Sequence, residues 1–200
     1  MRARNLLPAR GRRGASGRRK AELPRAVFLT GFMGAGKTSV GRALARRLGW
    51  RFVDLDRRIE AAEGSSIRNL FEQRGEPGFR EAESAALHLL LAEIRRATGT
   101  VAALGGGTLT LARNRQFLRQ HGGTLVFLEA PLRTLHRRCR RTGRQRPLFA
   151  NYQQFRQLYL TRLPFYSQST LRVSTWRKRP HTVAAEVATA LGLGPGQEVR

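Results

Sequence analysis

A glycine-rich loop between a strand pattern and a helix pattern constrains the fold of this chain more than any other feature. The apolar run 26–30 predicts a β-strand, and residues 31–38, GFMGAGKT, follow it directly. Val40, Leu44 and Leu48 then recur at the spacing of one helix face. A strand, a loop of the form G-x-x-x-x-G-K-[ST] and a helix in this order are typical of parallel α/β proteins with a phosphate-binding loop.

The residue types in this loop suit a ligand that carries several phosphate groups. Glycines let backbone N–H groups curl around phosphate oxygens, and the N-terminus of the following helix adds a positive dipole end. We expect Lys37 to reach the β- and γ-phosphates of a nucleoside triphosphate and the Thr38 hydroxyl to hold Mg²⁺. The predicted phosphate-binding residues are Gly34, Ala35, Gly36, Lys37, Thr38 and Ser39.

Two aspartates lie close together in the stretch FVDLDRRIE, residues 52–60, of a chain that is otherwise short of acids. Segment 51–55 predicts a second strand, whose two-residue period would place Asp54 and Asp56 on one face. At the carboxyl end of that strand, one carboxylate can hold a metal-bound water and the other can take a proton from a substrate hydroxyl. The alternative is that Asp56 caps the next helix, which would explain one aspartate but not the pair.

An arginine and a glutamate share one stripe of the long helix that we expect over the segment EPGFREAESAALHLLLAEI, residues 76–94. Glu83 lies three residues after Arg80 and can orient its guanidinium as a two-pronged donor to a ligand carboxylate. On these two residues alone, the favoured interpretation is a surface ion pair worth only about 0.3–0.5 kcal/mol.

Three consecutive glycines, Gly105, Gly106 and Gly107, follow a buried-type strand at 101–104. Such a run is costly in chain entropy, so it indicates a ligand that approaches the backbone closely. The alternative is a tight turn, for which one or two glycines would be enough.

Arg162 lies on the apolar face of a predicted helix, with Phe155 and Leu158 on the same stripe. A buried guanidinium needs a carboxylate partner, and no acid occurs between residues 130 and 185. A ligand carboxylate is therefore an attractive partner. The alternative is that the stem of Arg162 packs inside while its head reaches water.

The segment RRTGRQRPLFANY, residues 140–152, joins two helical patterns and combines glycine with arginine. This composition suits a mobile lid that closes an arginine over a transferring phosphoryl group. We assign that role to Arg146, which is fixed next to Pro147, and consider Arg141 a candidate for stacking on the nucleotide base. The alternative is a solvated basic loop.

Positive charge is concentrated in two places in this chain of net charge +25. Residues 1–25 mix Arg, Gly, Pro and Ala and predict a disordered basic arm, which could contact nucleic acid, act as a leader or be dispensable. The second concentration, 133–179, falls inside the folded part and suits a polyanionic ligand. Any contact with nucleic acid is expected only through the arm.

Other features limit the class of protein. Cys139 is the only cysteine, so no internal disulfide can form and a reducing compartment is expected. No secretory signal is present, and the longest apolar run is too short to span a bilayer. The histidines have no spacing typical of a metal site. We therefore expect a cytoplasmic protein with no membrane association and one folded domain, 26–191, followed by a flexible tail, 192–200.

The combination of motifs resembles the shikimate kinase family. The matching pieces are GFMGAGKTSVG, FVDLDRRIE, GEPGFREAE, LGGGTLT, RPLF and RLPFY, in the order and spacing of that family from about residue 26 to about residue 191. The resemblance implies transfer of a phosphoryl group from ATP, with Mg²⁺, to the 3-hydroxyl of shikimate. It also implies a monomer and a P-loop kinase fold with strand order 2-3-1-4-5.

The resemblance also assigns roles to individual residues. Asp54 would hold Mg²⁺ through water, and Asp56 would contact the ring hydroxyls and act as base. The shikimate side of the site would consist of Arg80, Arg162, Gly105, Gly106, Gly107, Phe71 and Phe79. Arg146 would be the lid arginine, and Arg141 would border the adenine together with Lys178 and the residues up to Pro180. Two features depart from the family pattern, a slightly short lid and Ser174 where many members have an acid.

The periodicities predict the α/β fold independently. Strand-like runs occur at 26–30, 51–55, 100–104, 124–128 and 171–175, with helical segments between them. This alternation indicates a five-stranded parallel sheet, covered by helices on both faces through right-handed crossovers. Segments near 59–80 and 141–152 are the expected mobile parts, the latter being the lid.

Two other functions fit part of the sequence. A gluconate kinase of the same architecture would also use the P-loop and a basic lid. Against it stands the combination of two carboxylate-binding arginines, Arg80 and Arg162, with the aspartate pair and the triple glycine. A P-loop module that binds nucleic acid would instead use the basic arm, with ATP as a regulator.

Overall fold

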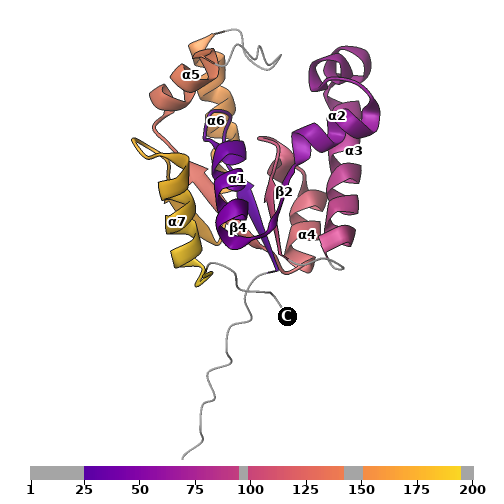
Figure 1. Ribbon diagram of the computed structural model, residues 1–200. Coiled ribbons are helices and arrows are strands. Elements are labelled where there is room, and N and C mark those ends of the chain that lie inside the picture. Colours follow the sequence, from indigo (N-terminus) through magenta and orange to yellow (C-terminus); the bar gives the residue numbers. More distant parts are fainter. Residues whose placement is uncertain (1–24, 95–98, 142–150, 195–200) are drawn as a thin grey trace, which may run out of the picture.

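Five parallel strands form the centre of the structure, a computed structural model that describes residues 25–94, 99–141 and 151–194 (Figure 1). Their order across the sheet is β2-β3-β1-β4-β5, which confirms the predicted order 2-3-1-4-5. The strands are β1 (Ala26–Thr30), β2 (Arg51–Asp54), β3 (Thr100–Ala103), β4 (Thr124–Glu129) and β5 (Leu171–Ser174).

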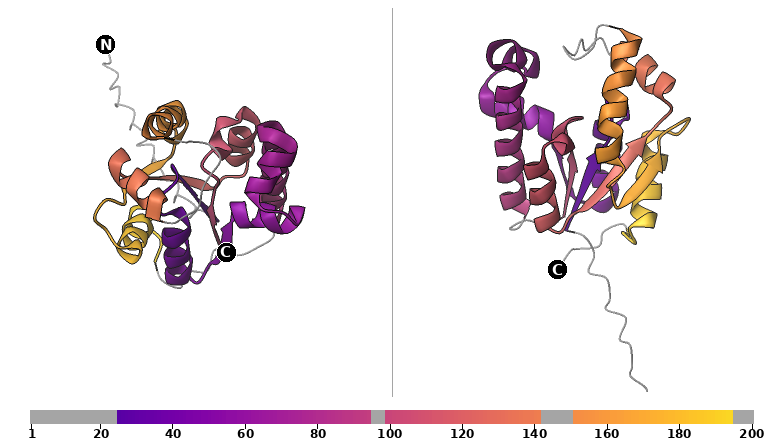
Figure 2. Two further views of the ribbon diagram at one scale, coloured as in Figure 1. Left: turned by 90° about the horizontal axis from the view of Figure 1, so that it is seen from above. Right: turned by 180° about the vertical axis from the view of Figure 1, so that it is seen from behind.

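Helices cover both faces of this sheet, as predicted. Figure 2 shows α1 packed beside α7 on one side, whereas α4 and α6 lie on the other side. The α-helices are α1 (Lys37–Leu48), α2 (Leu55–Glu63), α3 (Ile67–Ile94), α4 (Ala112–Gln120), α5 (Leu132–Arg141), α6 (Tyr152–Tyr166) and α7 (Pro180–Ala190), and a short 3-10 turn, η1, spans Thr108–Thr110.

The central strand β1 is buried along its whole length, which explains its continuous apolar sequence. It pairs with β3 on one side and β4 on the other, so that Val27 lies opposite both Val101 and Thr124. The carboxyl ends of β1, β2 and β3 therefore meet at one edge of the sheet. The phosphate loop, the aspartates and the triple glycine all follow these ends, so the topology gathers them in one place.

The second strand is shorter than predicted. β2 ends at Asp54, and α2 begins at Leu55, so the expectation of a strand over 51–55 was wrong at its last residue. Leu55 is fully buried at the start of the helix, and the Asp54 side chain caps this helix by accepting a hydrogen bond from the Arg57 N–H, while the apolar side chain of Leu55 stays in the core. The difference changes how Asp56 reaches the site.

The long third helix is interrupted near its middle. Gly75 has φ 65° and ψ −176°, and Pro77 follows two residues later, so two helical stretches meet at a kink. Glycine adopts this left-handed φ at low cost, and proline is tolerated in the first turn of the second stretch. The second stretch corresponds to the predicted helix 76–94 and carries Arg80 and Glu83.

The ordered contacts at the carboxyl terminus continue slightly beyond α7. Leu193 is buried, and its backbone N–H donates to the carbonyl oxygen of Ala188 at 2.8 Å. Most of the predicted arm and tail lies outside the described residues. Within the described ranges, none of the helices combines the length and the apolar composition needed to cross a membrane.

We predict that Leu87→Ala will lower the free energy of unfolding by about 2–5 kcal/mol, because Leu87 is 0% exposed on α3 and its loss leaves a cavity. The matched control is Leu89→Ala on the same helix, where the side chain is 58% exposed and the change should stay within about 0.5 kcal/mol. Urea unfolding of both variants measures the difference. Equal losses would contradict the observed orientation of α3.

Candidate active site

A pocket of about 820 Å³ opens where these strand ends meet. It brings together residues from α1, β2, α3, the triple glycine, α5, α6 and α7. Of the predicted site residues, Arg146 alone lies outside the described residues. All the others line this pocket, namely Gly34, Ala35, Gly36, Lys37, Thr38, Ser39, Asp54, Asp56, Phe71, Phe79, Arg80, Gly105, Gly106, Gly107, Arg141, Arg162 and Lys178.

The phosphate loop has the backbone shape that its glycines allow. Gly34 adopts φ 79°, and a Cβ there would lie 2.7 Å from the carbonyl oxygen of Leu135. The Lys37 ammonium donates to the carbonyl oxygen of Gly31 at 2.8 Å, across the loop. α1 starts at Lys37 and has no acidic residue in its first turn. Its N-terminus therefore offers the positive end of the helix to an anion.

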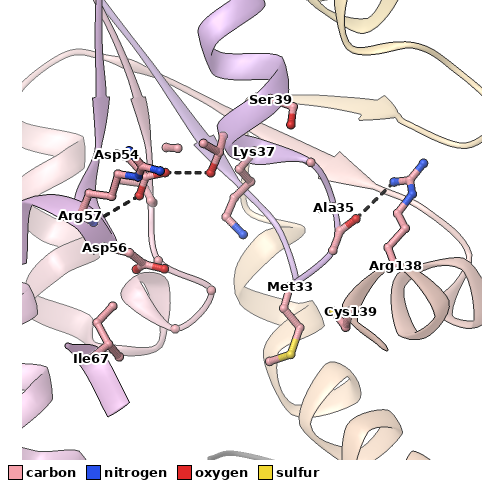
Figure 3. Close-up of a pocket in the computed structure, with 18 of the residues that line it drawn as sticks. Met33, Ala35, Lys37, Ser39, Asp54, Asp56, Arg57, Ile67, Arg138 and Cys139 are labelled. Atoms are coloured by element: carbon pink, nitrogen blue, oxygen red, sulfur yellow. Dashed lines mark hydrogen bonds between the residues drawn. The ribbon is translucent and has the colours of Figure 1, made fainter. Parts of the chain in front are cut away.

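Asp54 links the phosphate loop to the second strand. As the last residue of β2, it caps α2, because its carboxylate accepts a hydrogen bond from the Arg57 N–H at 3.4 Å. Its other oxygen accepts from the Thr38 hydroxyl at 2.7 Å (Figure 3). The capping role that the sequence suggested for Asp56 thus belongs to Asp54, which performs it while facing the pocket.

Asp56 enters the pocket from a helix and not from a strand. It lies in the first turn of α2, so the prediction that a two-residue strand period aligns the aspartates was wrong. The change from strand to helix after Asp54 still directs both carboxylates toward the cavity that Lys37 enters (Figure 3). A Cβ at Gly105 would lie 2.9 Å from Asp56 Oδ1, which places this carboxylate against the glycine run.

Arg80 and Glu83 form a buried ion pair, so the interpretation as a surface pair was wrong. The Arg80 guanidinium donates to Glu83 at 2.7 Å and also to Glu76 at 2.9 Å. The second oxygen of Glu83 accepts from the Thr108 hydroxyl at 2.7 Å. Burial raises the pKa of Glu83, and attraction to Arg80 and the Thr108 hydrogen bond oppose that rise.

Arg162 is buried without an acidic partner among the described residues. Its side chain comes from α6, the residue is 4% exposed, and its guanidinium lies 6.0 Å from the ring centre of Phe32. Within the described ranges it forms no ion pair, and its pKa is lowered mainly by burial, with the charge of Arg80 acting in the same direction. The alternative in which its head reaches open water is therefore wrong.

Tyr166 anchors the end of α6 to the triple glycine. Its buried hydroxyl donates a hydrogen bond to the carbonyl oxygen of Gly106, sixty residues away in the chain. Burial raises the pKa of Tyr166, and the positive charge of Arg162 opposes this rise. The tyrosine therefore remains a hydrogen-bond donor and fixes the loop next to Arg162. The sequence analysis did not find this contact.

Each glycine of the triple run makes room for a different polar side chain. A Cβ would lie 2.5 Å from Glu83 Oε1 at Gly105, 3.4 Å from Arg162 Nη1 at Gly106, and 2.3 Å from Arg80 Nη2 at Gly107. At the first and third positions, any side chain would force the charged group of Glu83 or Arg80 to move. The run therefore lets the charged groups of the pocket approach the backbone, which a simple turn would not require.

Two phenylalanines form an aromatic wall beside Arg80. The rings of Phe71 and Phe79 stack with centres 4.6 Å apart, and the Arg80 guanidinium lies 5.2 Å from the Phe79 ring. Both rings line the pocket, so this side combines cationic groups with an apolar surface. Such a surface suits a small organic acid with a carbon ring.

Arg138 is a pocket residue that the sequence analysis missed. Its guanidinium donates to the carbonyl oxygen of Gly34 at 3.2 Å and to the hydroxyl and carbonyl oxygens of Thr175 at 3.1 and 2.9 Å. Burial lowers its pKa, and the neighbouring Arg137 adds to the effect. Arg138 thus joins the phosphate loop to the loop after β5. The sequence signal that could have identified Arg138 is its position three residues after the apolar Leu135, which places it near the buried face of α5.

The opposite end of the pocket from Arg80 is lined by side chains from α5 and α7. Arg141, at the end of α5, and Lys178, before α7, both line it, and Lys178 pairs with Glu186 at 2.7 Å. Pro180 and Val183 add apolar surface at this end of the pocket.

Together, the phosphate loop with its lysine, the aspartates and the anion-binding side define a P-loop kinase of small molecules.

Sequence relatives place the chain within this class. A sequence model of the family described as "Shikimate kinase" matches residues 33–192. The shikimate kinase of Persephonella marina is 34% identical over 163 residues, covering 82% of this chain and 96% of that protein. The shikimate kinase of Geobacter sulfurreducens is 41% identical over 168 residues, covering 82% and 90%. The chain belongs to the shikimate kinase family, as its motifs predicted.

Solved structures agree with the sequence relatives. The shikimate kinase from Acinetobacter baumannii in complex with shikimate superimposes with a TM-score of 0.77 at 36% identity, covering 85% of this chain and 94% of that one. A gluconokinase from Sinorhizobium meliloti has a TM-score of 0.56 at 19% identity, which shows a shared fold alone. The fold is therefore compatible with the gluconate kinase alternative, but the sequence similarity does not support it.

Proposed function

We propose that this chain transfers the γ-phosphoryl group of ATP to the 3-hydroxyl of shikimate, giving shikimate 3-phosphate and ADP. Membership of the shikimate kinase family supports the reaction. The similar enzyme from Acinetobacter baumannii was solved in complex with shikimate, and this similarity supports the choice of substrate.

The observation that carries this proposal is a buried guanidinium that forms no ion pair beside the triple glycine. Arg80 is paired with Glu83 and Glu76, whereas Arg162 is buried next to it and, among the described residues, is attracted by these glutamates without pairing with either. A buried cation that lacks a protein partner favours an anionic ligand, and a guanidinium binds a carboxylate with two parallel hydrogen bonds. We assign the shikimate carboxylate to Arg162 and Arg80.

The remaining groups suit the transfer itself. Asp56 accepts the proton of the 3-hydroxyl as that oxygen forms a bond to the γ-phosphorus. The bond between the γ-phosphorus and the bridging oxygen breaks, and its electron pair leaves with ADP. Lys37, held across the loop by the Gly31 carbonyl, neutralises charge on the β- and γ-phosphates.

The donor atoms at the start of α1 fit Mg²⁺. The Thr38 hydroxyl and the Asp54 carboxylate lie 2.7 Å apart and present oxygen atoms, which is the donor type that this ion prefers. We propose Thr38 as a direct ligand and Asp54 as the group that holds it through water. Bound Mg²⁺ would supply positive charge that the phosphate oxygens share.

The adenine and lid assignments follow from the pocket lining and from the family resemblance. We propose that Arg141, Lys178 and the apolar Pro180 border the adenine, because all three line the pocket beyond the phosphate loop. Phe71 and Phe79 would pack against the ring of shikimate. Arg146 would close over the phosphoryl group from the lid and exclude water, which is the competing acceptor.

We further propose that the enzyme works as a monomer in the cytoplasm. A single cysteine suits a reducing compartment. We propose that the basic arm has no part in the reaction.

Asp56→Asn tests the assigned base. The change keeps the shape of the side chain but removes its ability to accept a proton, so kcat should fall by about 10²–10⁴-fold while the Kd for ATP stays nearly the same. Steady-state kinetics and calorimetric titration with ATP measure the two quantities. Glu63→Gln, at the end of the same helix, is the control and should keep normal turnover. Near-normal kcat in Asp56→Asn would exclude the base role.

Arg162→Ala tests the carboxylate contact. Loss of a charge-assisted hydrogen-bonding partner worth about 1.5–3 kcal/mol should raise the KM for shikimate about 10–100-fold, with a smaller effect on kcat. Arg156→Ala on the exposed side of the same helix is the matched control. An unchanged KM for shikimate in Arg162→Ala would return this arginine to a purely structural role.

A further inference from the structure

Charge is distributed unevenly over the folded domain. Of the eleven acidic residues in the described ranges, nine lie between Asp54 and Glu93. Only Glu129 and Glu186 follow, and each is already paired, with Arg172 and Lys178 respectively. The part of the molecule that contains α5, α6 and the loop before α7 therefore carries a large excess of arginine.

Three of these arginines form a stripe along α5. Arg133, Arg137 and Arg140 follow each other at four and three residues, and all three are exposed, whereas Thr134 and Leu135 on the opposite face are buried. None of the three forms an ion pair within the described part of the chain. Like charges on one helix face repel, so their arrangement has a cost that an anionic partner would remove.

Two exposed aromatic rings belong to segments that contact α5. On α6, Tyr152 is 40% exposed and its ring lies edge-on to His136, with centres 5.1 Å apart. In the loop after β5, the Arg138 hydrogen bonds hold α5 against Thr175, and the adjacent Trp176 is 47% exposed. Trp176 also borders a hollow of about 310 Å³ that Leu132 and Tyr159 line.

The backbone next to Trp176 is held in an unusual conformation. Arg177 has φ 55° and is the one non-glycine residue at positive φ among the described residues. This conformation places its guanidinium 4.9 Å from the Trp176 ring centre. A non-glycine residue keeps such a backbone conformation only when its surroundings hold it in place. The loop therefore displays a planar cation and an indole together on the surface.

We propose that this face, defined by Arg133, Arg137, Arg140, Tyr152, Trp176 and Arg177, binds single-stranded nucleic acid. A row of arginines can contact successive phosphates of an extended strand, and exposed rings on the segments that contact α5 offer platforms for unstacked bases. The bases of a duplex are stacked inside it and could not pack on those rings. A charged face that contacts only solvent would not need exposed aromatic side chains. The face lies outside the residues assigned to the kinase reaction, so it constitutes a second function and not part of that site.

The test measures binding of the full chain to a fluorescent oligouridylate of about 15 nucleotides, between about 50 and 200 mM salt. Replacement of Arg133, Arg137 and Arg140 by Gln should weaken binding and reduce the salt slope by about 2, since each phosphate contact contributes about 0.7. The matched control replaces Arg46, Arg47 and Arg119 by Gln, which removes equal charge from exposed positions elsewhere. That control should leave the slope nearly unchanged.

Trp176→Ala separates base stacking from general attraction to polyanions. It should weaken oligouridylate binding about 5–100-fold, because stacking of a base contributes about 1–3 kcal/mol, but it should not change binding of inorganic polyphosphate. In each variant, shikimate-dependent ADP release should match that of the unmodified chain, which shows that the domain is folded.

Three results would overturn the proposal. In the first, the Arg133, Arg137 and Arg140 variant and its control lose equal affinity. In the second, all binding disappears when the eight basic residues within 1–20 are replaced by Ser, while the α5 and Trp176 variants bind normally, which would assign nucleic-acid binding to the arm. In the third, Trp176→Ala affects oligouridylate and polyphosphate binding equally, which would exclude base stacking.

Discussion

The buried carboxylate of Glu83 organises the substrate side of this molecule. One of its oxygens holds Arg80 and the other holds Thr108, so a single side chain on α3 connects a pocket arginine to the turn that follows the triple glycine. Gly105 passes so close to Glu83 that a side chain there would force the Glu83 carboxylate to move. A buried carboxylate without these partners would be very costly, and the network therefore requires α3, the glycines and η1 to take up these positions together.

The same arrangement explains how charge is shared between protein and substrate. Glu83 and Glu76 balance Arg80, and Tyr166 fixes the glycine loop beside Arg162 but provides no negative charge. One buried guanidinium therefore forms no ion pair among the described residues. On the other side of the cavity, the hydrogen bond between Thr38 and Asp54 joins the phosphate loop to β2. The acceptor and donor halves of a phosphoryl transfer thus meet at the edge of one sheet.

Much of this could be predicted from the sequence because its signals are local. The phosphate loop, the five strands and the apolar face that contains Arg162 all depend on residue types at short spacing. The end of β2 could not be predicted, because Asp54 and Asp56 fit both strand alternation and a helix cap. The structure shows that the cap at Asp54 begins the helix one residue earlier than the alternation implied.

Local sequence patterns could not predict the contacts between segments that are distant in the chain. Burial of the Arg80–Glu83 pair depends on Thr108, 25 residues after Glu83, and the anchor of the glycine loop is Tyr166, 60 residues after Gly106. Arg138 was hard to recognise for another reason. In a helix where most residues are arginine or apolar, only its bonds to Gly34 and Thr175 distinguish it from its exposed neighbours.

The most direct test of the proposed activity is ADP release by the purified chain with Mg²⁺ and ATP, measured with shikimate, with gluconate and without an acceptor. Release that depends on shikimate alone is the predicted result, because Arg162 and Arg80 favour a carboxylate on a ring that the Phe71 and Phe79 wall can cover. Equal release with gluconate, or release that needs no acceptor, would contradict the assignment of this pocket to shikimate.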